Sequence, residues 1–239
     1  MKYIRKQSEP KEFVDWKDSA SESWMPTFDN MRGSPSGVDH IVKRALLREQ
    51  GWLCCYCEQR ITEDNSHIEH FLPRQFYKKE DDAYYENSLD YDNLLCSCMK
   101  EPGRDNDDHC GHYKDRNKRY DRSLYEQKFL ISPCDPSCEQ RFKYNNKGGI
   151  ESVAKNDVAA QKTIDQLGLN NGDLPQRRRE IIDIFYGAGR EPLTEDDIDS
   201  ITVDEQRTYA EGYLRQGSDG SFNEYWTTMQ YLLNQLSPH

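Results

Sequence analysis

The sequence contains no long apolar run. Only 35% of its 239 residues are hydrophobic and its mean hydropathy is −1.04. No segment approaches the roughly 20 apolar residues that a membrane helix needs. The first ten residues, Met1 to Pro10, also lack the apolar stretch of a secretory signal peptide. We therefore expect a cytoplasmic protein with no membrane partner, a modest core and a strongly polar surface.

The sequence also lacks the phosphate-cradling motif Gly-x-x-x-x-Gly-Lys-Ser/Thr, so any control by ATP must come from another protein. It has little positive charge as well. Its formal net charge is −11, whereas phosphate binding depends on clustered lysine and arginine. Residues 112–122 are an exception, with five basic and two acidic side chains. This segment is either a solvated face or a nucleic-acid contact, and for the contact we choose Lys114, Arg116, Lys118 and Arg119.

Cysteine, by contrast, occurs eight times, which in a reducing compartment favours metal ligands or small buried side chains over disulfides. Cys54-x-x-Cys57 has the spacing of a knuckle that presents two thiolates to one ion. A closed tetrahedral zinc site needs a second pair, and for this we choose Cys98 and Cys110. One further cysteine lies beside each pair, and we interpret these two as parts of the core. The alternative for Cys54, Cys57, Cys98 and Cys110 is that they, too, are core residues and bind no metal.

Between the two cysteine pairs lie residues that can hydrolyse a phosphodiester. His70 is the candidate general base, because imidazole titrates near neutral pH. Glu69 offers a hard oxygen ligand suited to Mg²⁺ or Mn²⁺, which would neutralise charge that develops on the phosphate. Asn93 is expected to hydrogen-bond to His70 and to fix its ring.

The order of these residues resembles the HNH, or ββα-metal, superfamily: a cysteine knuckle, an acid–histidine pair, Asn-Leu-Leu, a second knuckle and a lysine. In that superfamily the histidine is the general base, the acid binds the metal and the asparagine orients the histidine. A third ligand usually follows the last cysteine, and that position is Gly111 here. His112 is our first substitute and His109 our second. His67 shares a strand face with Glu69 and is a further candidate.

Segments outside this motif narrow the resemblance to the PtuB family, the HNH subunit of Septu-type anti-phage systems, which also occurs beside retrons. The segments that carry it are 1–10, 67–74, 109–114, 131–142, 163–170 and 177–179. The resemblance implies an effector endonuclease that cuts DNA or tRNA and works with a PtuA-like ATPase. A retron reverse transcriptase and its DNA/RNA product are further partners that it suggests. The alternative is a zinc-braced adaptor or nucleic-acid-binding protein that has lost catalysis, which the glycine at position 111 makes conceivable.

The fold class that we expect is α+β and mainly helical, with a small zinc-braced ββα-metal core between helical N-terminal and C-terminal parts. Apolar spacing predicts helices over 38–50, 153–167, 174–186, 202–214 and 222–236. We further expect irregular chain over 1–37, a local hairpin of 58–61 with 67–72, and a short helix over 91–99.

Lys147-Gly-Gly149 indicates a turn and a domain boundary. It separates an expected HNH nuclease domain at 1–149, with its catalytic core at about 51–122, from a helical region at 150–239. The helical region contains aromatic residues that could dock a partner or fill its own core: Tyr209, Tyr213, Tyr225, Trp226 and Tyr231.

Overall fold

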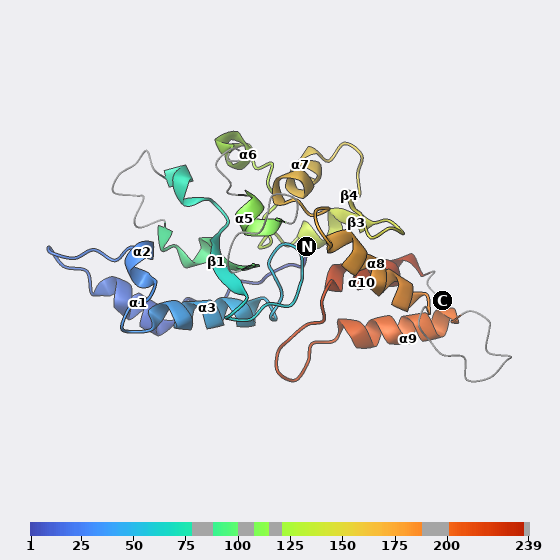
Figure 1. Ribbon diagram of the computed structural model, residues 1–239, viewed down its shortest axis with the longest axis horizontal. Helices are drawn as coiled ribbons and strands as arrows, with labels where there is room; N and C mark the ends of the chain where they lie inside the picture. The colour runs from blue at the N-terminus through green and yellow to red at the C-terminus, as the bar shows by residue number, and fades with distance from the viewer. Residues whose placement is uncertain (78–87, 100–107, 115–120, 188–200, 237–239) are drawn as a thin grey trace.

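The computed structural model describes residues 1–77, 88–99, 108–114, 121–187 and 201–236, which form a mixture of helices and small sheets (Figure 1). The α-helices are α1 (Lys11–Asp18), α2 (Phe28–Met31), α3 (Val38–Glu49), α5 (Cys110–Lys114), α6 (Arg122–Glu126), α7 (Val158–Leu167), α8 (Leu174–Phe185), α9 (Val203–Leu214) and α10 (Trp226–Gln235). The strands are β1 (Ser66–His70), β2 (Leu94–Cys98), β3 (Phe142–Tyr144) and β4 (Ile150–Ser152). Short 3₁₀ turns cover Arg74–Tyr77, Tyr91–Asn93 and Cys138–Gln140.

An antiparallel pair of strands, β1 and β2, positions the candidate site. Its register places Ser66 opposite Cys98 and His70 opposite Leu94. Every residue of β2 is buried, because α3 and α5 both pack against this strand. The side chain of Gln50, just after α3, holds the strand by donating to Cys96 O at 2.8 Å and accepting from Cys96 N at 2.6 Å. In Figure 1, α5 lies between β1 and α7, near the middle of the molecule.

Helix α3 illustrates how apolar spacing builds this part of the core. Val38, Val42 and Leu46 recur every four residues on one face, and each is at most 1% exposed. Gly51 follows the helix with φ +59°, a left-handed conformation that suits glycine and ends the helix. The predicted helix over 38–50 is therefore confirmed.

A second antiparallel hairpin, β3 with β4, leads into the C-terminal helices. The turn of Lys147-Gly-Gly149 connects the two strands, so the expected boundary at residue 149 falls inside this hairpin. Helices α8, α9 and α10 pack on one another through a small core of their own, at the right of Figure 1. That small core consists of Ile182, Phe185, Ala210, Met229 and Leu232. The predicted helices over 174–186, 202–214 and 222–236 are confirmed, the last with a later start.

The predicted hairpin of 58–61 with 67–72 is wrong. Residues 58–61 instead fold back on the knuckle: Ile61 N donates to Trp52 O at 3.0 Å, and Arg60 forms an isolated bridge with Leu53. The backbone groups of residues 58–61 thus already form hydrogen bonds within the knuckle. Strand β1 instead pairs with β2, further along the chain.

The predicted helix over 91–99 is also wrong, since a 3₁₀ turn at 91–93 leads directly into β2. The sequence of a strand that is buried on both faces is a continuous run of apolar residues. The spacing of apolar residues alone does not distinguish such a strand from a buried helix. Residues 1–37, expected to be irregular, contain α1 and α2. Pro10 starts α1 at its N-cap instead of interrupting it. The helix predicted from 153 begins at Val158, because the Asp157 carboxylate caps it by accepting from Ala160 N.

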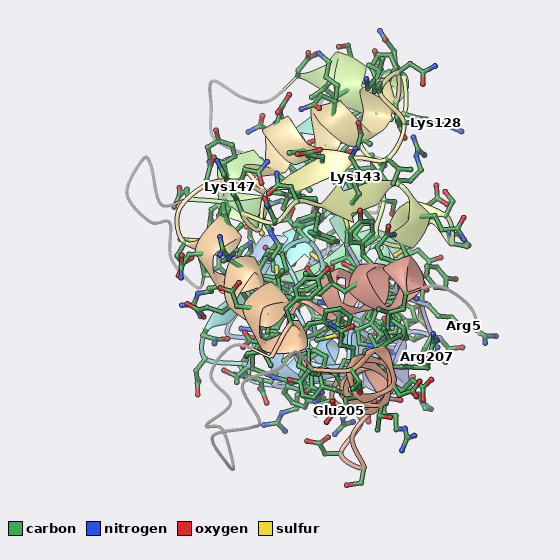
Figure 2. The ribbon with its side chains drawn as sticks, turned by 90° about the vertical axis from the view of Figure 1, so that its right-hand side faces the viewer. Arg5, Lys128, Lys143, Lys147, Glu205 and Arg207 are labelled. Atoms are coloured by element: carbon green, nitrogen blue, oxygen red, sulfur yellow. The ribbon has the colours of Figure 1, made fainter. Side chains whose placement is uncertain are left out.

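The surface carries many charged side chains, and Figure 2 shows Arg5 and Lys128 among those at its edge. Across the described ranges, every helix is too short or too polar to cross a lipid bilayer.

Candidate metal centre and active site

Four cysteines converge in the main core. The sulfurs of Cys54, Cys57, Cys98 and Cys110 all lie within 4.8 Å of one another, and all four residues are buried. Cys57 Sγ and Cys98 Sγ are 3.7 Å apart. Two sulfurs bound tetrahedrally to zinc at ~2.3 Å lie about 3.8 Å apart, so this cluster has dimensions that suit a zinc ion. The structure thus brings together the four cysteines that the spacing selected, and they can hold a metal ion.

The surroundings of Cys54 favour its thiolate form. Burial raises the pKa of this thiol, but hydrogen bonds from Cys110 and the other neighbouring sulfurs outweigh burial and hold the pKa well below its usual value. Cys98 N also donates to Cys54 Sγ at 3.3 Å. Burial raises the pKa of Cys110 well above its usual value, because several buried sulfurs cannot ionise together without a cation among them. A bound metal ion would supply that cation.

His109 lies beside this cluster. Its Nδ1 is 3.1 Å from Cys110 Sγ and 3.5 Å from Cys98 Sγ. His109, our second substitute for the third ligand of the catalytic metal, thus directs Nδ1 at the cysteine sulfurs.

Glu69, near the end of β1, is a buried carboxylate with three polar neighbours. Its Oε1 accepts a hydrogen bond from Tyr56 OH at 3.0 Å and pairs with Lys114 Nζ at 3.0 Å. Its Oε2 lies 3.4 Å from His67 Nε2. Burial opposes ionisation, but the charge of Lys114 and the hydrogen bond and charge of His67 outweigh it and lower the pKa of Glu69 to about 2. The side chain is therefore a carboxylate at neutral pH, as a ligand of Mg²⁺ or Mn²⁺ must be.

His70 is held in one tautomer. Its Nε2 lies 2.8 Å from Ser88 O, and since a carbonyl oxygen can only accept, Nε2 carries the proton. The neutral ring then has its lone pair on Nδ1. Burial lowers the pKa of His70 to about 4, which keeps the ring uncharged at neutral pH. The ring of Phe28, in α2, packs on this ring in a T-shaped arrangement with centroids 4.5 Å apart. His70 therefore has the protonation state of a base.

Asn93 acts on the chain that follows His70 and not on its ring. Asn93 Oδ1 accepts from Leu72 N at 2.7 Å, and Asn93 Nδ2 donates to Leu72 O at 3.0 Å. Phe71 N donates to Asn93 O at 3.0 Å. The predicted hydrogen bond between Asn93 and His70 is replaced by these backbone contacts, and the ring is fixed by Ser88 instead.

Lys114, at the end of α5, is fully buried. Its ammonium group donates to His70 O at 3.0 Å in addition to its ion pair with Glu69. The expectation that Lys114 contacts nucleic acid does not fit this burial, because its ammonium group pairs with Glu69 inside the protein. The other three predicted nucleic-acid contacts, Arg116, Lys118 and Arg119, lie outside the described residues.

His67 lies beside Glu69, and the ring of His112 packs on that of His67 with centroids 4.1 Å apart. His67 Nδ1 is 2.7 Å from Met99 O, and His112 Nε2 is 3.0 Å from the same oxygen. Burial lowers the pKa of His67, but the hydrogen bond and charge of Glu69 outweigh it and raise the pKa overall. His112, predicted as the third metal ligand, thus directs Nε2 at a backbone carbonyl.

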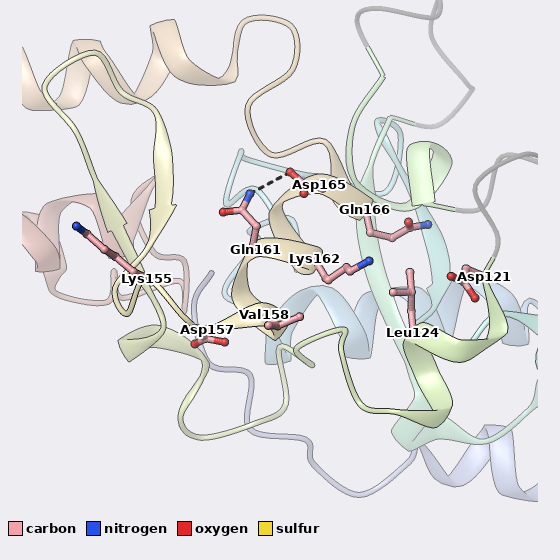
Figure 3. A pocket seen from close by; sticks show the side chains of 9 residues that line it. All are labelled: Asp121, Leu124, Lys155, Asp157, Val158, Gln161, Lys162, Asp165 and Gln166. Atoms are coloured by element: carbon pink, nitrogen blue, oxygen red, sulfur yellow. Dashed lines mark hydrogen bonds between the residues drawn. The ribbon is translucent and has the colours of Figure 1, made fainter.

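A separate open pocket of 580 Å³ lies between α6 and α7 (Figure 3). Its charged lining residues are Asp121, Lys155, Asp157, Lys162 and Asp165. Three carboxylates against two ammonium groups do not make a phosphate site, and no histidine or cysteine lines it. This pocket therefore offers no second candidate site for the chemistry proposed around β1, β2 and α5.

The chain is similar in sequence to known proteins. No family model matches the chain. A protein of Vibrio cholerae serotype O1 biovar El Tor, named "Retron Vc95 putative HNH endonuclease", is 30% identical over 155 residues, which cover 63% of this chain and 68% of that protein. A protein of Escherichia coli, named "Retron Ec83 putative HNH endonuclease", is 24% identical over 220 residues, which cover 80% of this chain and 83% of that protein.

These similarities support an HNH endonuclease in a retron-associated context. The chain belongs to the family of the retron HNH endonucleases.

Proposed function

We propose that the protein is a metal-dependent endonuclease that hydrolyses phosphodiester bonds of nucleic acid, with β1, β2 and α5 as its ββα-metal core. One observation carries this proposal. At the end of β1, an ionised carboxylate, Glu69, directly precedes a buried and neutral histidine, His70, whose lone pair is on Nδ1. A carboxylate ligand beside an unprotonated base is what metal-assisted hydrolysis requires.

In this mechanism Glu69 would hold Mg²⁺ or Mn²⁺, which neutralises charge on the phosphate and stabilises the leaving oxygen when bound. His70 takes a proton from water at Nδ1, while its Nε2–H remains bonded to Ser88 O. Lys114 keeps Glu69 ionised and holds the carbonyl of His70 in place. Asn93 fixes the turn after β1, so the ring cannot drift from its position.

The cysteine cluster has a structural role in this proposal. With zinc bound to its four sulfurs, it would join the knuckle at 54–57, the end of β2 and the start of α5. Those three segments carry or support Glu69, Asn93 and Lys114, so the ion would keep the site assembled.

The negative charge of the chain supports a division of labour with a partner. A net charge of −11 opposes tight independent binding to nucleic acid. We propose that a PtuA-like ATPase delivers the substrate, and that the complex serves anti-phage defence together with a retron reverse transcriptase and its DNA/RNA product. Weak intrinsic affinity would also limit damage to the host's own nucleic acids.

A cleavage assay tests this function. Plasmid, single-stranded DNA and total RNA would be incubated with Mg²⁺ or Mn²⁺ and the wild type, His70→Ala or His40→Ala, each alone and with the partner ATPase. His40 is an exposed histidine on α3 and serves as the matched control. We expect cleavage by the wild type and by His40→Ala, and a loss of about 10²-fold or more in His70→Ala. Absence of cleavage in every arm would instead support a zinc-braced adaptor.

A further inference from the structure

We propose that His67 is the second protein ligand of the catalytic cation, in place of the residue that Gly111 lacks. This inference rests on the proposed function, because it concerns the same metal. It assigns Glu69 Oε2 and His67 Nε2, which are 3.4 Å apart, as the two protein atoms that share the ion.

The geometry of His67 is that of a prepared ligand. Its Nδ1 lies 2.7 Å from Met99 O, and because that carbonyl oxygen can only accept, Nδ1 is the donor. Coordination therefore has to use Nε2, which is the nitrogen directed at Glu69. Histidine ligands commonly donate their other ring N–H to a backbone carbonyl, which fixes the ring orientation.

The separation of the two atoms also fits one ion. Adjacent ligands of an octahedral cation bound at about 2.1 Å lie about 3 Å apart, and slightly further when the angle opens. Glu69 Oε1 is turned away toward Tyr56 and Lys114, so Oε2 is the oxygen directed at His67. A carboxylate oxygen and an imidazole nitrogen form a donor set that suits Mn²⁺.

Gly111 makes room for this pair. A Cβ at this position would lie 2.5 Å from Glu69 Oε2 and 2.8 Å from His67 Nε2, closer than side-chain carbons approach such atoms. A ligand side chain at residue 111 therefore cannot coexist with His67 in its present place. The glycine lets the first turn of α5 approach β1 closely, and His67 reaches the position from the strand instead.

His112 is the competing candidate, and its Nε2 is 3.0 Å from Met99 O. Its ring packs on that of His67, which makes it a positioning residue for His67. This gives the inference a matched control, because the two histidines are adjacent and share one carbonyl partner, and the inference rests on the contact of His67 Nε2 with Glu69 Oε2.

The test is Mn²⁺ binding, measured by titration calorimetry and by pulsed electron paramagnetic resonance on protein whose cysteine site is kept loaded with zinc. The spectrum detects nitrogen nuclei bound directly to Mn²⁺. For the wild type and His112→Ala, we expect binding with one coordinated imidazole nitrogen. For His67→Ala, we expect about tenfold weaker binding or more and no nitrogen signal. Gly111→Ala is expected to weaken binding as well.

Retention of the nitrogen signal and of wild-type affinity in His67→Ala would overturn the inference, and its loss in His112→Ala would assign the ligand to His112. A wild type that binds Mn²⁺ no better than Glu69→Gln would remove the cation from this site altogether, and with it the proposed function. Binding that depends on His67 together with no cleavage of any substrate would leave the ligand in place and contradict only the nuclease. Circular dichroism spectra of the variants confirm that each is folded.

Discussion

Lys114 and Glu69 form an ion pair inside the protein, with side chains that are 0% and 4% exposed. A buried pair contributes little net stability relative to apolar residues of similar volume, but removing one partner leaves an uncompensated charge. This asymmetry explains how a lysine at the end of α5 can serve the site without reaching the substrate. Its charge lowers the pKa of Glu69, and its ammonium group also donates to His70 O at 3.0 Å and to Phe71 O at 3.5 Å.

Replacing this lysine by an apolar residue tests its burial. We expect Lys114→Met to lower the free energy of unfolding by about 3–5 kcal/mol, measured by urea denaturation without added divalent cation. Lys143→Met is the control, because Lys143 pairs with Glu151 at the surface and such pairs contribute about 0–1 kcal/mol. The double variant Lys114→Met/Glu69→Gln should recover part of the loss. Equal effects of the two lysine variants would mean that Lys114 is solvated.

The environment of His70 predicts an unusual pH dependence. Its pKa is lowered from the ordinary 6.5 to about 4, mainly by burial. The neutral ring, which is the active form, therefore persists as the pH falls through 6.5 and is lost only near 4. A cation beside it would lower the pKa further. With metal and substrate saturating, we expect kcat to remain level down to about pH 5. A decline centred near pH 6.5 that is attributable to His70 would contradict the burial of this ring.

At the scale of elements, the end of β1 depends on a single side chain from the turn before β2. Asn93 makes two hydrogen bonds to the backbone of Leu72, at 2.7 and 3.0 Å, and so fixes the direction in which the chain leaves His70. We expect Asn93→Ala to cost about 1–3 kcal/mol of unfolding free energy, because the partly buried backbone groups of Leu72 are left unpaired. Cleavage should fall with it, since the base loses its fixed position.

Asp92→Ala is the matched control for this variant, because the neighbouring Asp92 side chain is exposed. It should change the unfolding free energy by no more than about 0.5 kcal/mol. Denaturation and cleavage would be measured on the same preparations. If Asn93→Ala kept full stability while cleavage fell, Asn93 would instead act at the reaction itself.

The elements also show what a sequence can and cannot predict. The spacing of Val38, Val42 and Leu46 is local information, and the helix that it predicts is present. The pairing of β1 with β2 is not local, and a nearer segment, 58–61, has a similar pattern but uses its backbone within the knuckle. The convergence of four cysteines followed from spacing and tetrahedral chemistry. The contacts of Asn93 with Leu72 and the approach of Gly111 to Glu69 depend on sub-ångström backbone placement, which no pattern encodes.

At the scale of the whole molecule, the candidate zinc cluster is part of the main core. Its four cysteines pack in one buried cluster with residues from α3, β2 and α7, and the C-terminal helices attach close by. Thr227, in α10, donates through its backbone N to Glu58 Oε2 at 2.8 Å, and Glu58 directly follows Cys57. The knuckle therefore connects the N-terminal helices, the catalytic strands and α10.

Removing the metal should consequently affect the entire fold. Structural zinc contributes about 10–16 kcal/mol of apparent binding free energy, whereas a whole domain is stable by only about 5–15 kcal/mol. We expect a strong chelator to abolish the cooperative thermal transition seen by circular dichroism, and Cys57→Ser to abolish both this transition and zinc content measured by mass spectrometry. Cys134→Ser, outside the cluster, should retain both. If the chelated protein instead melted within a few degrees of the untreated one, the four sulfurs would act as apolar core atoms. Burial alone would then hold together the strands that carry Glu69 and His70.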